Sequence, residues 1–114
     1  GELGAQQTLA CDVTQDAQID GLASQLKSQG TVLNAVVHSI AFANKEDLSR
    51  PFVETSRAGF ALAQDVSAYS LVAVAHALAP LMAPMAAPPP VYSAVLLWAP
   101  IPTVPFFTRS VVLS

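Results

Sequence analysis

The feature that most constrains this chain is a long segment without formal charge, since no Asp, Glu, Lys or Arg lies between Val66 and Thr108. A segment this apolar is buried in a core, covered by another subunit or inserted in a membrane. The prolines argue against the membrane alternative, because seven of the nine lie after residue 83. They leave no uninterrupted apolar run of about 20 residues, which a membrane-spanning helix needs. We therefore expect that the chain does not enter the membrane.

Composition narrows the class of protein further. The length of 114 residues suits one domain. Charged residues make up 11% of the chain, against roughly 25% in an average soluble domain. Five Lys and Arg residues without a cluster argue against nucleic-acid binding. Cys11 is the only cysteine, so we expect neither an internal disulfide nor a metal site.

The first part of the chain alternates between strand and helix patterns. Residues 8–13 and 33–40 are short apolar runs that are typical of buried strands. Residues 14–30 carry apolar side chains at helical spacing. Thr14 is the expected N-terminal cap of this helix, and Gly30 is its expected end.

The second part extends the alternation. Residues 41–54 are polar and predict an exposed loop. A second helix is expected from Thr55 or Ser56 to about Met82, and residues 91–97 could add a third strand. This order of elements predicts an α/β fold with a parallel sheet.

Ligands of such a fold bind outside the carboxyl ends of the strands. The sequence shows two of these ends, at residues 11–13 and 38–41. Neither carries the Gly-x-Gly-x-x-Gly pattern or a Walker phosphate loop. The residues by themselves therefore indicate part of a nucleotide-binding type of α/β domain and nothing more specific.

Four segments share their order and spacing with one known family: Cys-Asp-Val-Thr (11–14), Val-His-Ser-Ile-Ala-Phe-Ala (37–43), Glu-Thr-Ser-Arg-Ala-Gly-Phe (54–60) and Asp-Val-Ser-Ala-Tyr-Ser (65–70). They resemble the bacterial NADH-dependent enoyl-[acyl-carrier-protein] reductases, which are divergent short-chain dehydrogenase/reductases. The resemblance implies a fragment of a Rossmann-type, doubly wound parallel sheet. It divides the chain into a central part of the reductase domain, residues 1–82, and a Pro-rich apolar tail, residues 83–114.

The resemblance also implies an activity. The family reduces the trans-2 double bond of an enoyl thioester carried on acyl carrier protein, in type II fatty acid synthesis. NADH donates a hydride to C3, and the resulting enolate is protonated at C2. Members form homotetramers through helices such as the apolar one expected here. Nothing in the resemblance implies a nucleic-acid or membrane partner.

Two residues after the first strand are expected at the adenine end of NADH. By the resemblance, Asp12 accepts a hydrogen bond from the adenine amino group, and the backbone N–H of Val13 meets a ring nitrogen. A carboxylate beside an N–H suits adenine, which offers a donor next to an acceptor. The alternative interpretation is that Asp12 only caps the following helix.

The run after the second strand is expected at the other end of the cofactor. By the same resemblance, Ser39, Ile40 and Ala41 lie along the ribose and nicotinamide, and Ala43 borders the acyl or inhibitor pocket. Small side chains at these positions let a ligand approach closely. From the sequence alone, the run is equally a strand end followed by a turn.

Other residues that could carry chemistry are given none. We expect hydrogen bonds to hold His38 in place, and we expect Cys11 to be a small buried hydrophobe. His76 is expected to be a packing or interface residue. Asp65 occupies the position where ordinary short-chain dehydrogenases keep a catalytic Asn, but the enoyl reductases depart from that pattern themselves.

Several parts of the family pattern are missing from this sequence. No Gly-rich pyrophosphate turn precedes the first strand, and the strand end that separates NADH from NADPH is absent too. The family's catalytic Tyr and Lys lie after the long helix, whereas the last Lys here is Lys45 and the last Tyr is Tyr92. We therefore assign no catalytic residue and expect the isolated chain to be inactive. Without its neighbouring strands, the sheet is expected to have bare edges.

The tail after Met82 departs from the family outright. One hypothesis is a frameshift, because the codons for Trp98-Ala99-Pro100 read one base earlier permit the family's Leu-Gly-Ala. The alternative is a genuine Pro-rich extended tail.

Three other functions stay open. The chain could belong to another short-chain dehydrogenase/reductase such as a ketoacyl reductase, although Ser-Ile-Ala at 39–41 replaces the Asn-Ala-Gly of ordinary members. It could be a non-catalytic interaction module that joins other subunits through helix 56–82. A membrane-tail protein is the last alternative.

Overall fold

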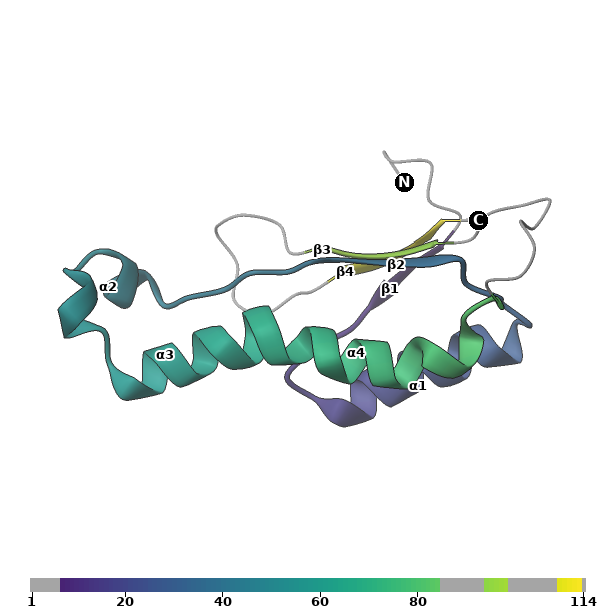
Figure 1. Ribbon diagram of the computed structural model, residues 1–114, viewed down its shortest axis with the longest axis horizontal. Coiled ribbons are helices and arrows are strands. Elements are labelled where there is room, and N and C mark those ends of the chain that lie inside the picture. The colour runs from purple at the N-terminus through teal and green to yellow at the C-terminus, as the bar shows by residue number, and fades with distance from the viewer. Residues whose placement is uncertain (1–6, 85–93, 99–108, 114) are drawn as a thin grey trace.

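The computed structural model describes residues 7–84, 94–98 and 109–113, and strands and helices alternate up to the strand Ala94–Trp98 as the sequence predicts (Figure 1). The elements are β1 (Gln7–Ala10), α1 (Asp16–Ser28), β2 (Ala35–Ser39), α2 (Lys45–Leu48), the 3₁₀ turn η1 (Phe52–Glu54), α3 (Arg57–Gln64), the π-helical turn η2 (Asp65–Tyr69), α4 (Ser70–Leu78), the 3₁₀ turn η3 (Ala79–Leu81), β3 (Ala94–Trp98) and β4 (Arg109–Leu113). The α/β prediction is confirmed.

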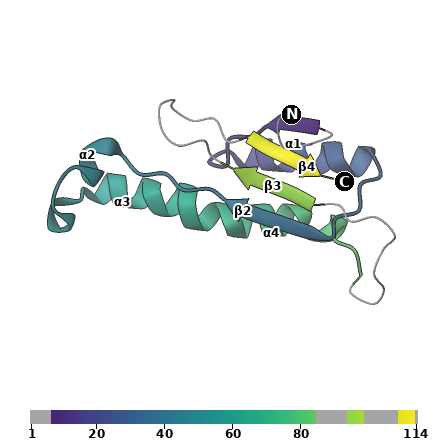
Figure 2. The same cartoon turned by 90° about the horizontal axis from the view of Figure 1, so that it is seen from above.

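The four strands form one sheet in the order β1-β4-β3-β2. β3 pairs with β2 in parallel, but β4 runs antiparallel to both of its neighbours, as Figure 2 shows for β3 and β4. The prediction of a wholly parallel sheet is therefore wrong, because β4 follows β3 within the same sheet without an intervening helix among the described elements.

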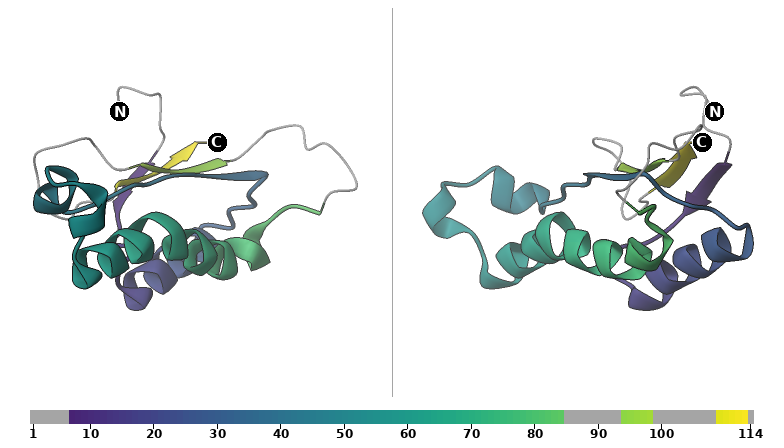
Figure 3. Two further views of the ribbon diagram at one scale, coloured as in Figure 1. Left: turned by 60° about the vertical axis from the view of Figure 1, so that its left-hand side comes forward. Right: turned by 45° about the vertical axis from the view of Figure 1, so that its right-hand side comes forward.

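The helices α1, α3 and α4 lie on one side of the sheet, whereas the short helix α2 lies beyond its end (Figure 3). A doubly wound fold has helices on both faces, so this part of the expectation is not met within the described residues. β3 lies on the β1 side of β2. The crossovers β1-α1-β2 and β2-α3-α4-β3 therefore have opposite hands, and one of them departs from the right-handed rule that about 98% of such crossovers obey.

The expected bare edges are only partly present. β1 and β2 are the outer strands, and their inner edges pair with β4 and β3. The resemblance implies that β1 and β2 correspond to the third and fourth strands of a Rossmann fold. In the usual Rossmann order, 3-2-1-4-5-6, two strands also separate the third strand from the fourth. Here the C-terminal segments fill those places, because an unpaired strand edge offers N–H and C=O groups that favour pairing.

The core lies between the sheet and the helix layer, where α1 packs against α4. The apolar stripe of α1 meets the buried side of the long helix, as the helical spacing predicts. The buried hydrophobic residues are Cys11, Val13, Ile19, Leu22, Leu26, Leu33, Ile40, Val66, Val74 and Leu78.

The two ends of α1 show one correct and one wrong prediction. Gly30 has a φ of 69°, its N–H donates to the Lys27 carbonyl, and the Thr31 N–H donates to the Leu26 carbonyl. This is a Schellman cap, so the expected role of Gly30 is confirmed. The N-cap, however, is Gln15 and not Thr14. The Thr14 side chain instead bonds to the Asp12 carboxylate, which removes it from the helix end.

The second helix is confirmed over Arg57–Leu81 as a run of α3, η2, α4 and η3. The loop expected over 41–54 contains the two short elements α2 and η1. By length and composition alone, Arg57–Leu81 could also cross a membrane, with a mean hydropathy of 1.3 in its most apolar window and 22% of that window buried. The core helix of a soluble protein passes the same criterion.

Truncation of a buried side chain on this helix tests the packing. Leu78→Ala should lower the free energy of unfolding by about 2–5 kcal/mol, because it leaves a cavity under the sheet. Urea unfolding followed by circular dichroism measures the change. Leu71→Ala is the matched control on the same helix, since Leu71 is 49% exposed, and it should change stability by less than about 1 kcal/mol. Equal effects of both substitutions would contradict the packing described here.

Candidate functional site

The carboxyl end of β1 presents an acceptor beside a donor. Oδ1 of Asp12 accepts hydrogen bonds from the Thr14 N–H (2.9 Å) and the Thr14 hydroxyl (2.8 Å). The Asp12 N–H donates to Oε1 of Gln18 at 2.8 Å. Among the described residues, no group donates to Asp12 Oδ2, and the Val13 N–H has no acceptor. A carboxylate oxygen of Asp12 and the N–H of the next residue thus have no partner within the described part of the chain, and Val13 itself is 4% exposed.

This geometry also resolves the alternative interpretation of Asp12. Its side chain closes the turn that precedes α1, and α1 has no side-chain cap at Gln15. Asp12 is therefore a turn residue that keeps one oxygen available, and it does not cap the helix directly.

The carboxyl end of β2 leads into an exposed run of small residues. Ser39 and Ala41 are exposed, Ile40 is 6% exposed and points into the core, and Ala43 is half-buried. The alternation follows from the strand, whose successive side chains face opposite sides. The backbone around Ser39 and Ala41 is thus accessible to a ligand, while Ile40 fixes it to the core.

The two strand ends lie at the same edge of the sheet, because β1 and β2 are both parallel to β3. They are not adjacent, since β4 and β3 lie between them. At about 4.8 Å per strand, a ligand that touches both ends must span about 14 Å. This favours an elongated ligand over a compact one.

Two serines of the long helix face the β2 end. The Ser67 hydroxyl accepts a hydrogen bond from the Phe42 N–H at 2.9 Å and donates one to the Phe42 carbonyl at 3.1 Å. The fully buried Ser70 donates to the Val66 carbonyl, and its Oγ lies 2.7 Å from Nε2 of His38. Burial lowers the pKa of His38. The expectation that hydrogen bonds hold His38 is confirmed.

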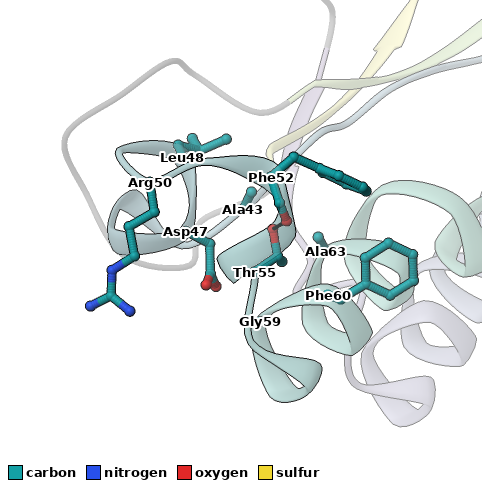
Figure 4. A pocket seen from close by; sticks show the side chains of 9 residues that line it. All are labelled: Ala43, Asp47, Leu48, Arg50, Phe52, Thr55, Gly59, Phe60 and Ala63. Carbon is teal, nitrogen blue, oxygen red and sulfur yellow. Dashed lines mark hydrogen bonds between the residues drawn. The ribbon is translucent and has the colours of Figure 1, made fainter.

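A cavity of about 320 Å³ opens beyond Ala43, between the loop with α2 and η1 and helix α3 (Figure 4). Its lining is mainly apolar, and in Figure 4 the Arg50 and Phe60 side chains lie at its opposite ends. The lining residues are Ala43, Asp47, Leu48, Arg50, Phe52, Thr55, Gly59, Phe60 and Ala63. The structure therefore places Ala43 in the lining of this cavity.

Asp47 ties the wall of this cavity to the start of α3. Its Oδ1 accepts the Ser56 N–H at 3.0 Å, and its Oδ2 accepts the Ser56 hydroxyl at 3.3 Å and Nδ2 of Asn44 at 3.4 Å. The Ser56 N–H is the main cause of a lowered pKa of Asp47. Ser56 in turn caps α3, because its hydroxyl accepts the Gly59 N–H.

Gly59 is small for a steric reason. A Cβ at this position would collide with Oδ2 of Asp47 and lie 2.8 Å from the Ser56 Oγ. In a capping box, the side chain of the third helical residue accepts the N–H of the N-cap residue. Here the third helical residue is Gly59, which has no side chain, and Asp47 accepts the Ser56 N–H instead. The sequence reasoning missed Asp47, Ser67 and Ser70, because their partners lie 9 to 32 residues away.

The remaining titratable groups do not form a reactive centre. Cys11 is buried, and desolvation together with the charge of Asp12 raises the pKa of its thiol to about 11. It stays protonated at neutral pH, as expected of a packing residue. His76 lines a second cavity of about 420 Å³ between α1 and the long helix. Within the described ranges, no three His, Cys, Asp or Glu side chains gather closely enough to bind a metal ion.

Comparison with known proteins gives one consistent result. A family model described as enoyl-(acyl carrier protein) reductase matches residues 1–88. The NADH-dependent enoyl-[acyl-carrier-protein] reductase of Bacillus subtilis is 47% identical over 74 residues, which are 65% of this chain and 29% of that protein. An NADPH-dependent enoyl-[acyl-carrier-protein] reductase of Staphylococcus aureus is 49% identical over 71 residues, or 62% of this chain and 28% of the relative.

The solved structures agree. The crystal structure of the NADH-dependent enoyl-[acyl-carrier-protein] reductase from Aquifex aeolicus has a TM-score of 0.61 and 44% identity, covering 63% of this chain and 28% of that one. The similarity supports a fold of the short-chain dehydrogenase/reductase type. The chain spans less than a third of the length of these relatives.

Two glycine substitutions test the contact between Gly59 and Asp47. Gly59→Ala should destabilise the protein by about 1 kcal/mol, because overpacking costs about 1–3 kcal/mol and outweighs a helix-propensity gain of about 1 kcal/mol. Gly21→Ala is the matched control, since nothing lies within 4 Å of its Cβ position; it should stabilise by about 1 kcal/mol. Thermal unfolding of both variants gives the comparison, and equal stabilisation by both would refute the contact.

The Asp47 carboxylate should make stability depend on pH. Its pKa lies below the ordinary value of 3.8 in the folded protein. The stabilisation is therefore present above that value and is lost as the pH falls through the folded-state pKa. Unfolding between pH 6 and pH 2 should show a steeper acid loss in the unaltered chain than in Asp47→Asn. Parallel curves for the two proteins would show that the carboxylate contributes nothing.

Proposed function

The chain belongs to the enoyl-(acyl carrier protein) reductase family, and on this premise we propose that it binds the nicotinamide dinucleotide and part of the acyl substrate of such an enzyme. The reaction is the reduction of a trans-2-enoyl thioester carried on acyl carrier protein. NADH supplies the hydride, which goes to C3, before protonation at C2. Cytoplasmic fatty acid synthesis is the proposed setting.

The observation that carries the proposal is the pair of available groups at the end of β1. Adenine offers an amino donor beside a ring-nitrogen acceptor, and the consecutive residues Asp12 and Val13 offer a carboxylate oxygen and an N–H that are both unengaged among the described residues. Asp12 is held by its other oxygen through two hydrogen bonds to Thr14. The carboxylate is thus oriented before the ligand arrives, which lowers the entropic cost of binding.

The end of β2 supplies the second half of the proposed cofactor site. The exposed residues Ser39 and Ala41 would run along the ribose and nicotinamide, and the buried Ile40 would hold this backbone in place. A dinucleotide suits the separation of about 14 Å between the two strand ends better than a mononucleotide does. Relatives named for NADH and for NADPH both match this chain, and we propose NADH from the resemblance.

The cavity beyond Ala43 is proposed as part of the acyl pocket. The aliphatic and aromatic side chains of Leu48, Phe52 and Phe60 line it. Apolar surface of this kind favours an acyl chain, because burial of each methylene contributes about 0.8 kcal/mol. Ala43 would border the thioester end of the chain without obstructing it.

We assign binding roles to this chain and no catalytic residue. No Lys follows Lys45 in the printed sequence, so we place no Tyr–Lys pair on these residues. The proposed division is a central part of a reductase domain over residues 1–82 and a tail over residues 83–114. We expect the 114-residue chain alone to bind NADH weakly at best and to lack enoyl reductase activity.

A homo-oligomer is proposed for the outer side of the long helix. Leu71 is 49% exposed there. The helix carries no formal charge after Asp65, and exposed apolar side chains on such a helix favour coverage by another subunit. A second copy of the chain, as in the family's tetramers, would cover it.

Asp12→Asn tests the adenine contact with little disturbance of the turn. The amide keeps an oxygen for Thr14 but presents an NH₂ donor where the adenine amino group needs an acceptor. We expect about tenfold weaker NADH binding, the loss of a hydrogen bond to a charged group. Calorimetry or NMR titration gives the dissociation constant. Asp20→Asn, which removes an exposed carboxylate from α1, is the control.

Reduced nicotinamide mononucleotide separates the two ends of the site. It lacks adenine, so its binding should be equal in Asp12→Asn and the unaltered chain. An unaltered chain that does not bind NADH, or an Asp12→Asn variant that binds NADH as well as the control, would overturn the proposed function.

A further inference from the structure

We propose that Ser67 and Ser70 are positioning residues that hold the segment from His38 to Phe42 at both of its ends. This inference rests on the proposed function, because the segment contains Ser39, Ile40 and Ala41 at the proposed ribose and nicotinamide site. The inference is supported by two contacts of the long helix with this segment, that of the Ser70 hydroxyl with His38 and that of the Ser67 hydroxyl with Phe42. Neither serine would touch the ligand.

Ser67 acts on the far end of the segment. Its hydroxyl accepts from the Phe42 N–H at 2.9 Å and donates to the Phe42 carbonyl at 3.1 Å. One hydroxyl therefore engages both backbone groups of a residue that lies three positions beyond the end of β2. A side chain without a hydroxyl cannot make this paired contact, so Ala at position 67 would remove both of these bonds from the end of the segment.

Ser70 acts on the near end. Its Oγ donates its only hydrogen to the Val66 carbonyl at 2.7 Å. It must therefore accept from His38, whose Nε2 lies 2.7 Å away, and His38 must carry its hydrogen on Nε2. Ser70 is fully buried, so the loss of this bond would leave a polar ring nitrogen without its partner at the end of β2.

The π-helical turn brings the two hydroxyls to the strand end. Over Asp65–Tyr69 the helix widens, and the Ser70 N–H donates to the Asp65 carbonyl five residues earlier. The Val66 carbonyl is then available for the Ser70 side chain. Isolated π turns inside α-helices are uncommon and occur frequently at functional sites. The π turn thus lets the helix form hydrogen bonds with the end of β2 in addition to its packing contacts.

The consequence concerns the proposed cofactor site. The segment is attached to the helix at His38 and Phe42 and to the core through Ile40, which is 6% exposed. Its exposed residues Ser39 and Ala41 are themselves small and cannot fix the backbone by packing. Contacts with the nicotinamide end therefore depend on the two serines, whereas contacts with adenine at Asp12 do not.

The experiment compares Ser67→Ala with Ser28→Ala in the full chain. Ser28 is an exposed serine whose hydroxyl also bonds to a backbone carbonyl, that of Gln25, so it is a matched control far from the strand end. Ser67→Ala should weaken binding of NADH and of reduced nicotinamide mononucleotide about fivefold, the equivalent of one or two neutral hydrogen bonds. Binding of ADP, which carries only the adenine end, should not change.

The His38 tautomer gives a second readout that ligand binding does not affect. Nitrogen-15 NMR of the imidazole should show hydrogen on Nε2 in the unaltered chain. Ser70→Ala should change this signature, and Ser70→Thr, which keeps the hydroxyl, should restore it together with nicotinamide binding. Circular dichroism confirms that each variant is folded; where Ser70→Ala is not, Ser67→Ala and Ser70→Thr carry the test.

The outcomes separate the inference from the proposed function. If NADH binds and Asp12→Asn weakens it, but Ser67→Ala binds both nicotinamide ligands like Ser28→Ala, the positioning role is wrong and the proposed function stands. Equal weakening of ADP and nicotinamide binding by Ser67→Ala would also overturn it, since that indicates general loss of structure. A chain that does not bind NADH at all contradicts the proposed function itself, while the His38 tautomer still tests the Ser70 contact.

Discussion

Burial of one side of the helix Arg57–Leu81 is the interaction on which the rest of this structure depends. Val66, Val74 and Leu78 face the core, where they meet α1 and the strands. This contact fixes the helix relative to β2 and so determines where the end of β2 lies. The opposite side of the helix keeps about half of several large apolar side chains exposed.

The residues of the proposed site are held in place by a few polar side chains within this mainly apolar structure. Hydroxyl groups of the helix bond to the β2 end, and a carboxylate from the preceding loop bonds to the start of α3. Each of these contacts joins segments that are distant in sequence. Together they place an exposed backbone segment and an apolar cavity next to each other. Asp12 and Val13 follow β1, which β4 and β3 separate from β2. The proposed site therefore extends along one edge of the sheet, from the end of β1 to the end of β2.

The sequence predicted those features that short-range signals specify. Gly30 ends α1 because only a residue that tolerates positive φ suits the Schellman cap. The strand runs and the long helix followed from hydrophobic periodicity, whereas the roles expected of Asp12 and Ala43 came from the resemblance to the family.

The remaining features depend on long-range contacts that no local pattern reports. Thr14 is a good N-cap residue, yet the Asp12 carboxylate competes for it and α1 starts after Gln15. Ser67 and Ser70 look like ordinary polar residues in an apolar helix until the strand end lies against them. The antiparallel β4 is specified by the free inner edge of β1, which the order of elements does not reveal. The resemblance to a family therefore gave more of the site than residue patterns did.

The most direct measurement of the central claim is an NMR titration of the nitrogen-15-labelled chain with NADH. One ligand that spans the two strand ends should shift the amide signals of Asp12 and Val13 together with those of residues 39–43, all with the same dissociation constant. Shifts confined to one strand end, or strongest on the exposed side of the long helix, would contradict a dinucleotide site along this edge of the sheet.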